Sequence, residues 1–252
     1  MCKMTNVNDL HDGKSLPEEA LVDLILSSGL SIKLICTPHH LPELVTGWLF
    51  TQGLIGGYDD ILSVQVCDFN TRVLVQIKPD CATGLTPPQM LLSSGCSGGR
   101  VLESSYEADN HICLSDLTVT IPFLTQGIGE MYQSAFGNSS PSGLHCAAII
   151  NGSDSRVLIA DSDVGRHNAV DKVIGAGLAS ATAFDKSVLV TSGRISSDMV
   201  LKAIRAGIPI VATRRSVTTL AAELAMKTGI TVVGRLARGE PLIVGSSERI
   251  LE

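Results

Sequence analysis

Residues 157–179 read Val-Leu-Ile-Ala-Asp-Ser-Asp-Val-Gly-Arg-His-Asn-Ala-Val-Asp-Lys-Val-Ile-Gly-Ala-Gly-Leu-Ala, and this stretch decides the fold. Its first four residues are apolar and predict a short strand. The polar residues from Asp161 onward predict a loop. From His167 to about Ala179 the apolar residues recur at helical spacing, so one face of a helix is buried, formed by Val170, Val173, Ile174 and Leu178.

The same alternation continues on both sides of this unit. It predicts further helices at 122–136, 196–205 and 218–227, and further strands at 146–151, 188–191, 209–212 and 231–233. Strands that alternate with helices are typical of a layered α/β domain. We therefore expect residues 117–252 to form such a domain.

The first part of the chain has a different pattern. Two apolar runs, 19–26 and 30–36, flank Ser27-Ser28-Gly29 and predict a β-hairpin. Helical spacing follows at 41–52, and two more strands are predicted at 61–67 and 72–77. We expect residues 1–116 to form a smaller N-terminal α+β domain that ends in a loop around Cys96.

Composition narrows the class of protein. The chain has 252 residues, of which 44% are hydrophobic, so it can bury a large core. It contains no apolar run of the roughly 18 residues that would span a bilayer, and residues 1–16 lack the apolar segment of a signal peptide, so we expect a cytoplasmic protein. Seven cysteines are scattered and never spaced Cys-x-x-Cys, which argues against a disulfide framework and a four-ligand zinc site.

Charge is distributed unevenly along the chain. Residues 1–185 contain 9 Lys+Arg and 20 Asp+Glu, a balance of −11, whereas residues 186–252 contain 10 and 5, a balance of +5. This asymmetry indicates an anionic ligand near the C-terminal third. With only 4% aromatic residues, base-stacking surfaces are not expected, and neither nucleic acid nor membrane is a predicted partner.

Three predicted strand-to-helix loops carry hydroxyl groups and cations. They are residues 161–172, 192–197 and 213–219. Ligands of such sheets bind at the carboxyl ends of strands, where helix N-termini and arginine side chains attract phosphate. One such loop would be ordinary helix capping, but three at one edge favour a site for a nucleotide or another compound with several phosphates.

The stretch Ser93-Ser-Gly-Cys96-Ser-Gly-Gly-Arg100 combines one thiol with small residues and a cation. One interpretation is a flexible surface turn in which the cysteine is incidental. The other is a mobile loop that presents a nucleophilic thiolate, whose anionic form Arg100 would favour. The spacing alone leaves both open.

Several catalytic patterns are missing. The chain has no Walker A motif and no Gly-x-Gly-x-x-Gly fingerprint. His145-Cys146-Ala147 lies where a zinc deaminase would have His-x-Glu, and no Pro-Cys-x-x-Cys follows, so we predict neither a metal site nor zinc-dependent deamination. His145 either lines a pocket or is a hydrogen-bonded histidine at a strand end.

Four motifs resemble the formate dehydrogenase accessory sulfurtransferase family of the FdhD/NarQ type. The similarity begins near Glu18 and covers nearly the whole chain. The motifs are Asp163-Val-Gly-Arg-His-Asn-Ala-Val-Asp-Lys172, Ser192-Gly-Arg194 with Ser196, Ala206-Gly-Ile-Pro209, and Thr37-Pro38 leading to Gly47-Trp-Leu-Phe-Thr-Gln-Gly-Leu-Ile55.

The resemblance implies a fold and an activity. It implies a cytidine-deaminase-like α/β domain without zinc catalysis, joined to the smaller N-terminal domain in a homodimer. It also implies a sulfur carrier, or sulfurtransferase, that accepts sulfur from a cysteine desulfurase as a persulfide. The recipient would be the molybdenum bis(guanine dinucleotide) cofactor, bound as a substrate before it enters formate dehydrogenase.

The resemblance also implies site residues. The persulfide would form on Cys96. Many members carry a second cysteine in this loop, whereas Gly99 stands at that position here. A non-catalytic chaperone that binds guanine nucleotide or molybdenum cofactor is therefore the alternative. In both cases the residues expected to bind the cofactor are Gly165, Arg166, His167, Asn168, Lys172, Ser192, Gly193, Arg194, Ser196, Thr218, Leu236, Ala237, Arg238, Gly239, Glu240 and Pro241.

Overall fold

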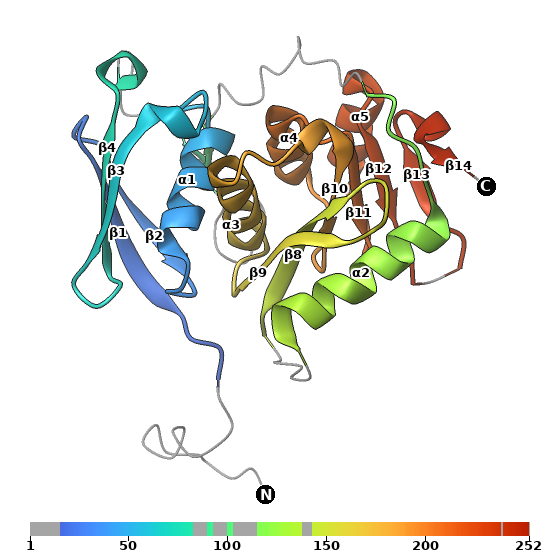
Figure 1. The fold of residues 1–252 in the computed structure, drawn as a ribbon, viewed down its shortest axis with the longest axis horizontal. Coiled ribbons are helices and arrows are strands. Elements are labelled where there is room, and N and C mark those ends of the chain that lie inside the picture. Colours follow the sequence, from blue (N-terminus) through green and yellow to red (C-terminus); the bar gives the residue numbers. More distant parts are fainter. Residues whose placement is uncertain are drawn as a thin grey trace, which may run out of the picture.

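A computed structural model describes residues 16–82, 90–92, 100–102, 115–137, 143–237 and 239–251. Of the β-sheets in the described residues, the two with more than two strands lie at opposite sides of the molecule, with helices between them and on the outer face of the larger sheet (Figure 1). The loop with Cys96, and Arg238, lie outside the described residues. In the described part of the chain, no helix is both long and apolar enough to cross a membrane.

The smaller sheet has four strands in the order β2-β1-β4-β3. The predicted hairpin is confirmed, because its two strands pair antiparallel; β3 and β4 also pair antiparallel, and β1 and β4 pair parallel. The strands are β1 (Ala20–Leu26), β2 (Ser31–Cys36), β3 (Ile61–Cys67) and β4 (Arg72–Ile77).

Helix α1 (Leu41–Thr51) covers one face of this sheet. Strand residues that alternate along β1 and β4 point toward it, as the period of two requires. The shared core is apolar, and its fully buried members include Val22, Leu24, Val45, Leu49 and Val73.

The larger sheet has six strands in the order β13-β12-β11-β10-β8-β9. Strands β10, β11 and β12 are parallel; β8 is antiparallel to β10 and β9 is antiparallel to β8, so β9 runs in the same direction as β10. The strands are β8 (His145–Asn151), β9 (Val157–Asp163), β10 (Ser187–Thr191), β11 (Ile210–Thr213), β12 (Thr231–Gly234) and β13 (Leu242–Val244).

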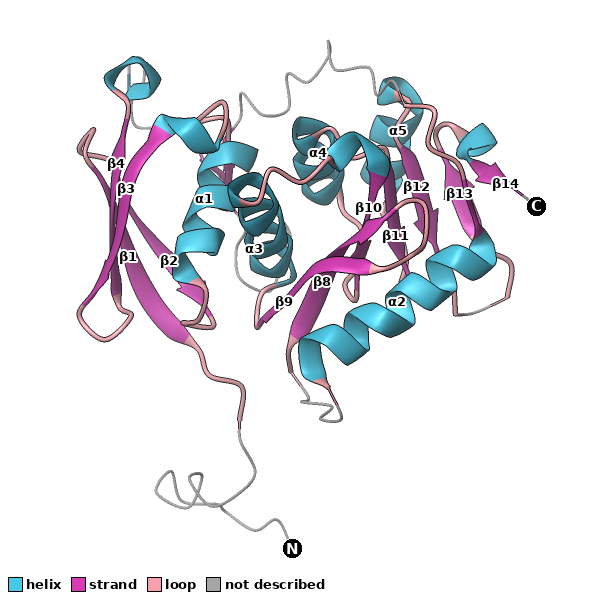
Figure 2. Cartoon of the chain, viewed as in Figure 1, coloured by secondary structure: helices cyan, strands magenta, loops and turns pink. Residues whose placement is uncertain are grey.

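Helices cover both faces of the larger sheet (Figure 2). Ala148 and Ile150 of β8 pack on the side of α2 (Ile121–Phe136), and their neighbours Ala147 and Ile149 pack on the opposite side. That side is covered by α3 (Arg166–Ala179), α4 (Ser197–Ala206) and α5 (Thr219–Thr228). The predicted α/β fold is confirmed; its likeness to cytidine deaminase in particular stays a prediction.

Helices α1 and α3 join the two parts of the molecule. A Cβ added to Gly47 would lie 1.9 Å from the backbone oxygen of Asp171, and one added to Gly175 would lie 1.9 Å from that of Glu43. Glycine at both positions therefore allows the two helix backbones to touch. Each part has a core of its own, and the domain boundary between residues 116 and 117 stays a prediction.

The structure corrects the expected limits of several elements. Asp161, Ser162 and Asp163 were expected in a loop but are the last residues of β9, since they pair with Ala147, Cys146 and His145. Short elements were not predicted, because two or three apolar residues show no periodicity. They include β13 and the strands β5 (Met90–Leu92), β6 (Arg100–Leu102), β7 (Val119–Thr120) and β14 (Ile250–Leu251), and the 3₁₀ turns Tyr58–Asp60, Pro79–Ala82, Phe184–Lys186 and Ser247–Arg249.

Candidate functional site

The carboxyl ends of four strands meet at one edge of the larger sheet. Strands β9, β10, β11 and β12 run in one direction, so the loops that follow them lie at the same end. Strand β8 begins at that end, and His145 pairs with Asp163 there. The expectation that the three polar loops share an edge is confirmed. We call this region, made of residues 192–196, 213–218 and 235–236 with His145 and Arg166, the carboxyl edge.

Backbone hydrogen bonds join these loops into one surface. Ile195 N–H donates to Ser216 O over 3.1 Å, and Thr218 N–H donates to Ile195 O over 3.0 Å. Arg235 N–H donates to Arg215 O over 2.8 Å. The loops after β10, β11 and β12 are therefore held in fixed positions relative to one another.

Arg166 opens helix α3 and lies against the loop after β10. A Cβ on Gly193 would come within 2.9 Å of the Arg166 side chain, so glycine makes room for it. The arginine is only 5% exposed, yet its Nε has no hydrogen-bond partner among the described residues. A buried polar atom without a partner is costly, and a bound anion is one means of satisfying it.

The loops after β10, β11 and β12 carry four exposed arginines. None of them forms an ion pair with a carboxylate in the described ranges of the chain. The positive balance of the C-terminal third is thus concentrated, in part, on the loops of the carboxyl edge. The exposed arginines are Arg194, Arg214, Arg215 and Arg235.

His145 is an uncharged neighbour of these cations. Burial lowers its pKa below the ordinary value, and the positive charges of Arg166, His167 and Arg215 lower it further. Ser192 Oγ lies 3.5 Å from His145 Nδ1 and accepts a hydrogen bond from Cys146 N–H over 2.9 Å. Of the two alternatives drawn from the sequence, the structure shows His145 at a strand end beside Ser192, and its place in a pocket stays a prediction.

His167 and Ser196 are buried and contact the carboxylate of Asp198. His167 Nε2 lies 2.5 Å from Asp198 Oδ2, and Ser196 Oγ donates to Asp198 Oδ1. Burial acts against ionisation of Asp198, but the bonds from His167 and Ser196 hold its pKa well below the usual range. Both side chains thus fix the start of α4 beneath the carboxyl edge.

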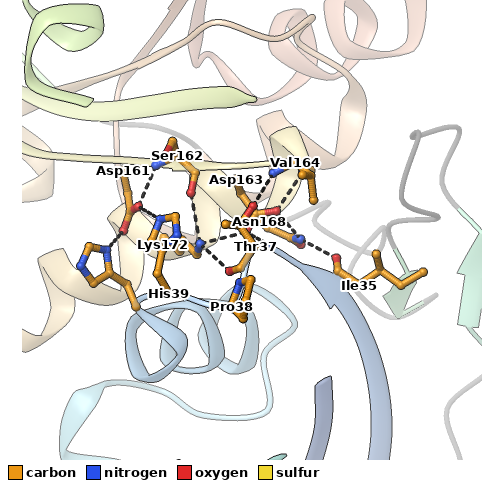
Figure 3. Close-up of polar contacts among 12 residues, drawn as sticks. Ile35, Thr37, Pro38, His39, Asp161, Ser162, Asp163, Val164, Asn168 and Lys172 are labelled. Carbon is orange, nitrogen blue, oxygen red and sulfur yellow. Dashed lines mark hydrogen bonds and ion pairs between the residues drawn. The ribbon is translucent and has the colours of Figure 1, made fainter. Parts of the chain in front are cut away.

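Lys172 lies in a different environment. It is fully buried, and its ammonium donates to Thr37 O and Ser162 O, each over 3.1 Å, and lies 2.9 Å from Asp163 Oδ2 (Figure 3). A ligand could not touch the ammonium without displacing these partners. Lys172 therefore ties the end of β2 to the end of β9.

Asp163 and Asn168 complete this polar contact. Asp163 Oδ2 accepts from Thr37 N–H over 3.1 Å, and Asp163 Oδ1 accepts from Gly165 N–H over 2.8 Å and from Asn168 Nδ2 over 2.9 Å. Asn168 also donates to Ile35 O over 2.9 Å (Figure 3). We call the contact between residues 35–40 and residues 161–172 the β2–β9 joint.

Two histidines of the β2–β9 joint were not identified from the sequence. His39 Nε2 lies 3.1 Å from Asp161 Oδ1, and His40 Nδ1 lies 2.8 Å from Asp161 Oδ2. The only signal in the sequence was the adjacent pair of histidines, because Asp161 is more than 120 residues away.

The remaining predicted residues lie in connecting segments. Thr218 is the N-cap of α5, and its Oγ1 accepts from Ala221 N–H over 3.3 Å. Gly165 precedes α3 as its N-cap. The connection from β12 to β13 holds the described residues Leu236, Ala237, Gly239, Glu240 and Pro241.

Four cysteines are described, and three of them are unsuited to form a thiolate. Burial raises the pKa of Cys36 to about 12 and that of Cys146 to about 11. Desolvation and the neighbouring Asp60 also raise the pKa of Cys81. Cys67, the fourth, is half-buried at the end of β3 in the smaller sheet, away from the carboxyl edge.

Together, the fold and the carboxyl edge define an α/β protein in which several strand-end loops present unpaired cations. Comparison with known proteins then identifies its family. The sequence pattern of the FdhD/NarQ family matches residues 17–251. The chain therefore belongs to the FdhD/NarQ family, as its motifs indicate.

Curated relatives and a solved structure agree with this assignment. A protein of Methanothermobacter thermautotrophicus named sulfur carrier protein FdhD is 31% identical over 245 residues, which is 94% of each chain. The protein of that name from Bacillus subtilis is 28% identical and covers 91% of this chain and 87% of its own. A crystal structure from Desulfotalea psychrophila, described as that of a formate dehydrogenase accessory protein, has a TM-score of 0.75, 28% identity, and coverage of 93% and 90% of the two chains.

Proposed function

We propose that the protein is a cytoplasmic sulfur carrier that serves the maturation of formate dehydrogenase. The names of its relatives support the general role of a sulfur carrier. The sulfur source would be a cysteine desulfurase, and the acceptor would be the molybdenum bis(guanine dinucleotide) cofactor, bound as a substrate. The working unit would be a homodimer.

Sulfur would be carried on Cys96. Its thiolate attacks the outer sulfur of the desulfurase persulfide; a new S–S bond forms on Cys96, and the desulfurase cysteine leaves as a thiolate. One thiol is sufficient for this transfer, because the persulfide forms on a single cysteine and the leaving group is the desulfurase thiolate. The raised pKa values of Cys36, Cys81 and Cys146 support this choice, because a thiol must ionise to act as a nucleophile.

The carboxyl edge would hold the guanine dinucleotides. Two observations carry this proposal: exposed arginines without carboxylate partners lie on the strand-end loops, and the Nε of buried Arg166 has no partner among the described residues. Guanidinium groups bind phosphate through paired, charge-assisted hydrogen bonds. Arg194 and Arg215 would contact phosphate directly, and Gly193 would allow close approach of the backbone.

Three residues expected from the family resemblance to contact the cofactor receive another role. His167, Asn168 and Lys172 are engaged with protein partners. We assign them to positioning: they fix α3 and the strand ends so that Gly165 and Arg166 face the ligand.

The test is the intact mass of the protein after incubation with a cysteine desulfurase and free cysteine. We expect the wild type to gain one sulfur atom, which a reductant removes. Cys96→Ser should gain none, while the matched variant Cys67→Ser should behave as the wild type. Sulfur retained by Cys96→Ser would overturn the assignment.

The alternative function is a chaperone that binds guanine nucleotide without carrying sulfur. The arginines of the carboxyl edge favour it as much as they favour the carrier, because they need no thiol. Guanine nucleotide binding without any gain of sulfur in the wild type would select this alternative.

A further inference from the structure

His39, His40 and Asp161 form a cluster of metal-ligating groups. One atom from each residue, two imidazole nitrogens and a carboxylate oxygen, lies within 4.8 Å of the other two. The two rings meet edge to face with centroids 4.9 Å apart, so both histidines converge on the same carboxylate. The cluster belongs to the β2–β9 joint and lies outside the carboxyl edge.

The ligand types favour a divalent cation of the first transition series. Imidazole nitrogen and carboxylate oxygen are the ligands that Zn²⁺ takes in sites with an open position. Bonds of about 2.0–2.2 Å place tetrahedral ligands about 3.3 Å apart. Each histidine nitrogen lies near its own oxygen of Asp161, 3.1 Å from Oδ1 for His39 and 2.8 Å from Oδ2 for His40. For a cation held by both carboxylate oxygens, each separation needs to widen by only a few tenths of an ångström.

The backbone holds His40 in place for this contact. Its φ of 50° and ψ of 44° lie in the left-handed region, which few residues other than glycine adopt. It is the N-cap of α1, yet its side chain makes no capping hydrogen bond. Serine, threonine and aspartate cap helices from an extended backbone, which His40 does not have, and its imidazole is directed to Asp161 instead.

The carboxylate is fixed by a second layer of hydrogen bonds. Asp161 is 8% exposed, and its Oδ1 accepts from Ser162 N–H over 2.7 Å. Ser162 O in turn accepts from Lys172 Nζ (Figure 3). Burial opposes ionisation of Asp161, but its bond to His39 and the charge of Lys172 lower the pKa, so the carboxylate is charged. Supporting bonds of this kind orient ligands in metal sites.

We propose that His39, His40 and Asp161 bind one divalent cation of the zinc type, which fastens the β2–α1 connection to the end of β9. The side chains of His39 and His40 are 39% and 62% exposed, so a cation enters from solvent and keeps at least one position for water or another small ligand. Binding therefore stabilises the contact between the two parts of the chain.

The test uses the full-length protein after removal of metal with a chelator. Zn²⁺ is titrated by calorimetry, and Co²⁺ is added separately to record its absorption spectrum. We expect one Zn²⁺ per chain, a Co²⁺ spectrum of low coordination number without thiolate charge-transfer bands, and a rise in melting temperature with Zn²⁺ but not with Mg²⁺. Asp161→Asn should weaken Zn²⁺ binding by about 100-fold or more, since losing a ligand costs at least as much as losing its support.

Two variants separate binding from folding. His40→Asn keeps a residue that tolerates left-handed backbone and caps helices, so it should stay folded but lose the affinity and the rise in melting temperature. Asp154→Asn, an exposed change of the same chemistry in the turn before β9, should bind as the wild type. Unchanged Zn²⁺ affinity in Asp161→Asn and His40→Asn, or thiolate bands in the Co²⁺ spectrum, would overturn the proposal.

Discussion

The β2–β9 joint and the carboxyl edge use similar residues in opposite ways. At the joint, each charged group has a polar partner: Lys172 lies against Asp163, and the carboxylate of Asp161 contacts the ring nitrogens of two histidines. At the carboxyl edge, Arg194 and Arg215 are exposed without carboxylate partners, and the Nε of Arg166 is buried without one. Paired charges stabilise the contact between two parts of a chain, whereas unpaired charges of one sign attract a ligand.

The ten-residue motif from Asp163 to Lys172 serves both regions. Asp163, Asn168 and Lys172 bond to residues of β2 and its following turn, while Gly165 and Arg166 begin α3 at the carboxyl edge. One motif thus contains residues that bond to the other part of the chain and residues that lie at the carboxyl edge. Substitutions in the joint, at the contact between α1 and α3, and at the carboxyl edge test this difference.

The largest loss of stability is expected when Lys172 of the β2–β9 joint is replaced. Lys172→Met leaves Asp163 charged and buried, which should lower the free energy of unfolding by about 3–5 kcal/mol. Urea denaturation measures this loss. Lys186→Met, at an exposed position, serves as the control and should change stability by less than about 0.5 kcal/mol. Equal stability of the two variants would contradict the structural role of Lys172.

A smaller loss is expected where α1 and α3 touch. Gly47→Ala forces a Cβ against the backbone oxygen of Asp171, so the helices must separate, at a cost of about 1–3 kcal/mol. Gly129→Ala in α2 is the matched change, because nothing lies within 4 Å of its added Cβ. That variant should instead gain up to about 1 kcal/mol from helix propensity. Thermal unfolding measures both variants. A lower stability of Gly47→Ala with a higher stability of Gly129→Ala would confirm the close helix contact, whereas a loss of stability in both would contradict it.

The smallest effect expected is on the pH dependence of stability, through His145 at the carboxyl edge. Because burial and Arg166 lower the pKa of His145, the unfolded chain binds a proton at His145 at higher pH than the folded protein does. Stability should therefore fall as pH decreases through about 6.5, the unfolded value. In His145→Asn the fall in denaturation midpoint between pH 7.5 and pH 5.5 should be smaller than in the wild type. The same fall in both proteins would show that His145 titrates normally.

Local patterns predicted much of the fold. The helix from Leu41 and the strands Ile61–Cys67 and Arg72–Ile77 are present at or near the expected residues, since periodicity and turn residues report nearby contacts. The parallel pairing of β1 with β4 and the contact of α1 with α3 were not predictable, because they join distant segments.

The sequence located the edge of the site better than the role of each residue in it. The alternation of strands and helices, together with the chemistry of the loops, was enough to assign Ser192, Arg194 and Arg215 to one edge of the sheet. Residue type gave no indication that Lys172 is fully buried or that Asp161 meets two histidines, because burial depends on the tertiary fold. Cys96 lies outside the described residues, and its role as persulfide carrier stays a prediction.

We propose above that the unpaired arginines of the carboxyl edge bind the phosphates of a guanine nucleotide. The most direct test of this claim is a calorimetric titration of GDP into three proteins: the wild type, Arg194→Ala/Arg215→Ala, and Arg72→Ala/Arg156→Ala, which removes the same charge from exposed positions elsewhere. We predict that the first double variant binds at least about tenfold more weakly, as expected from losing charge-assisted hydrogen bonds, and that the second binds as the wild type. Equal affinity in all three proteins would contradict the claim.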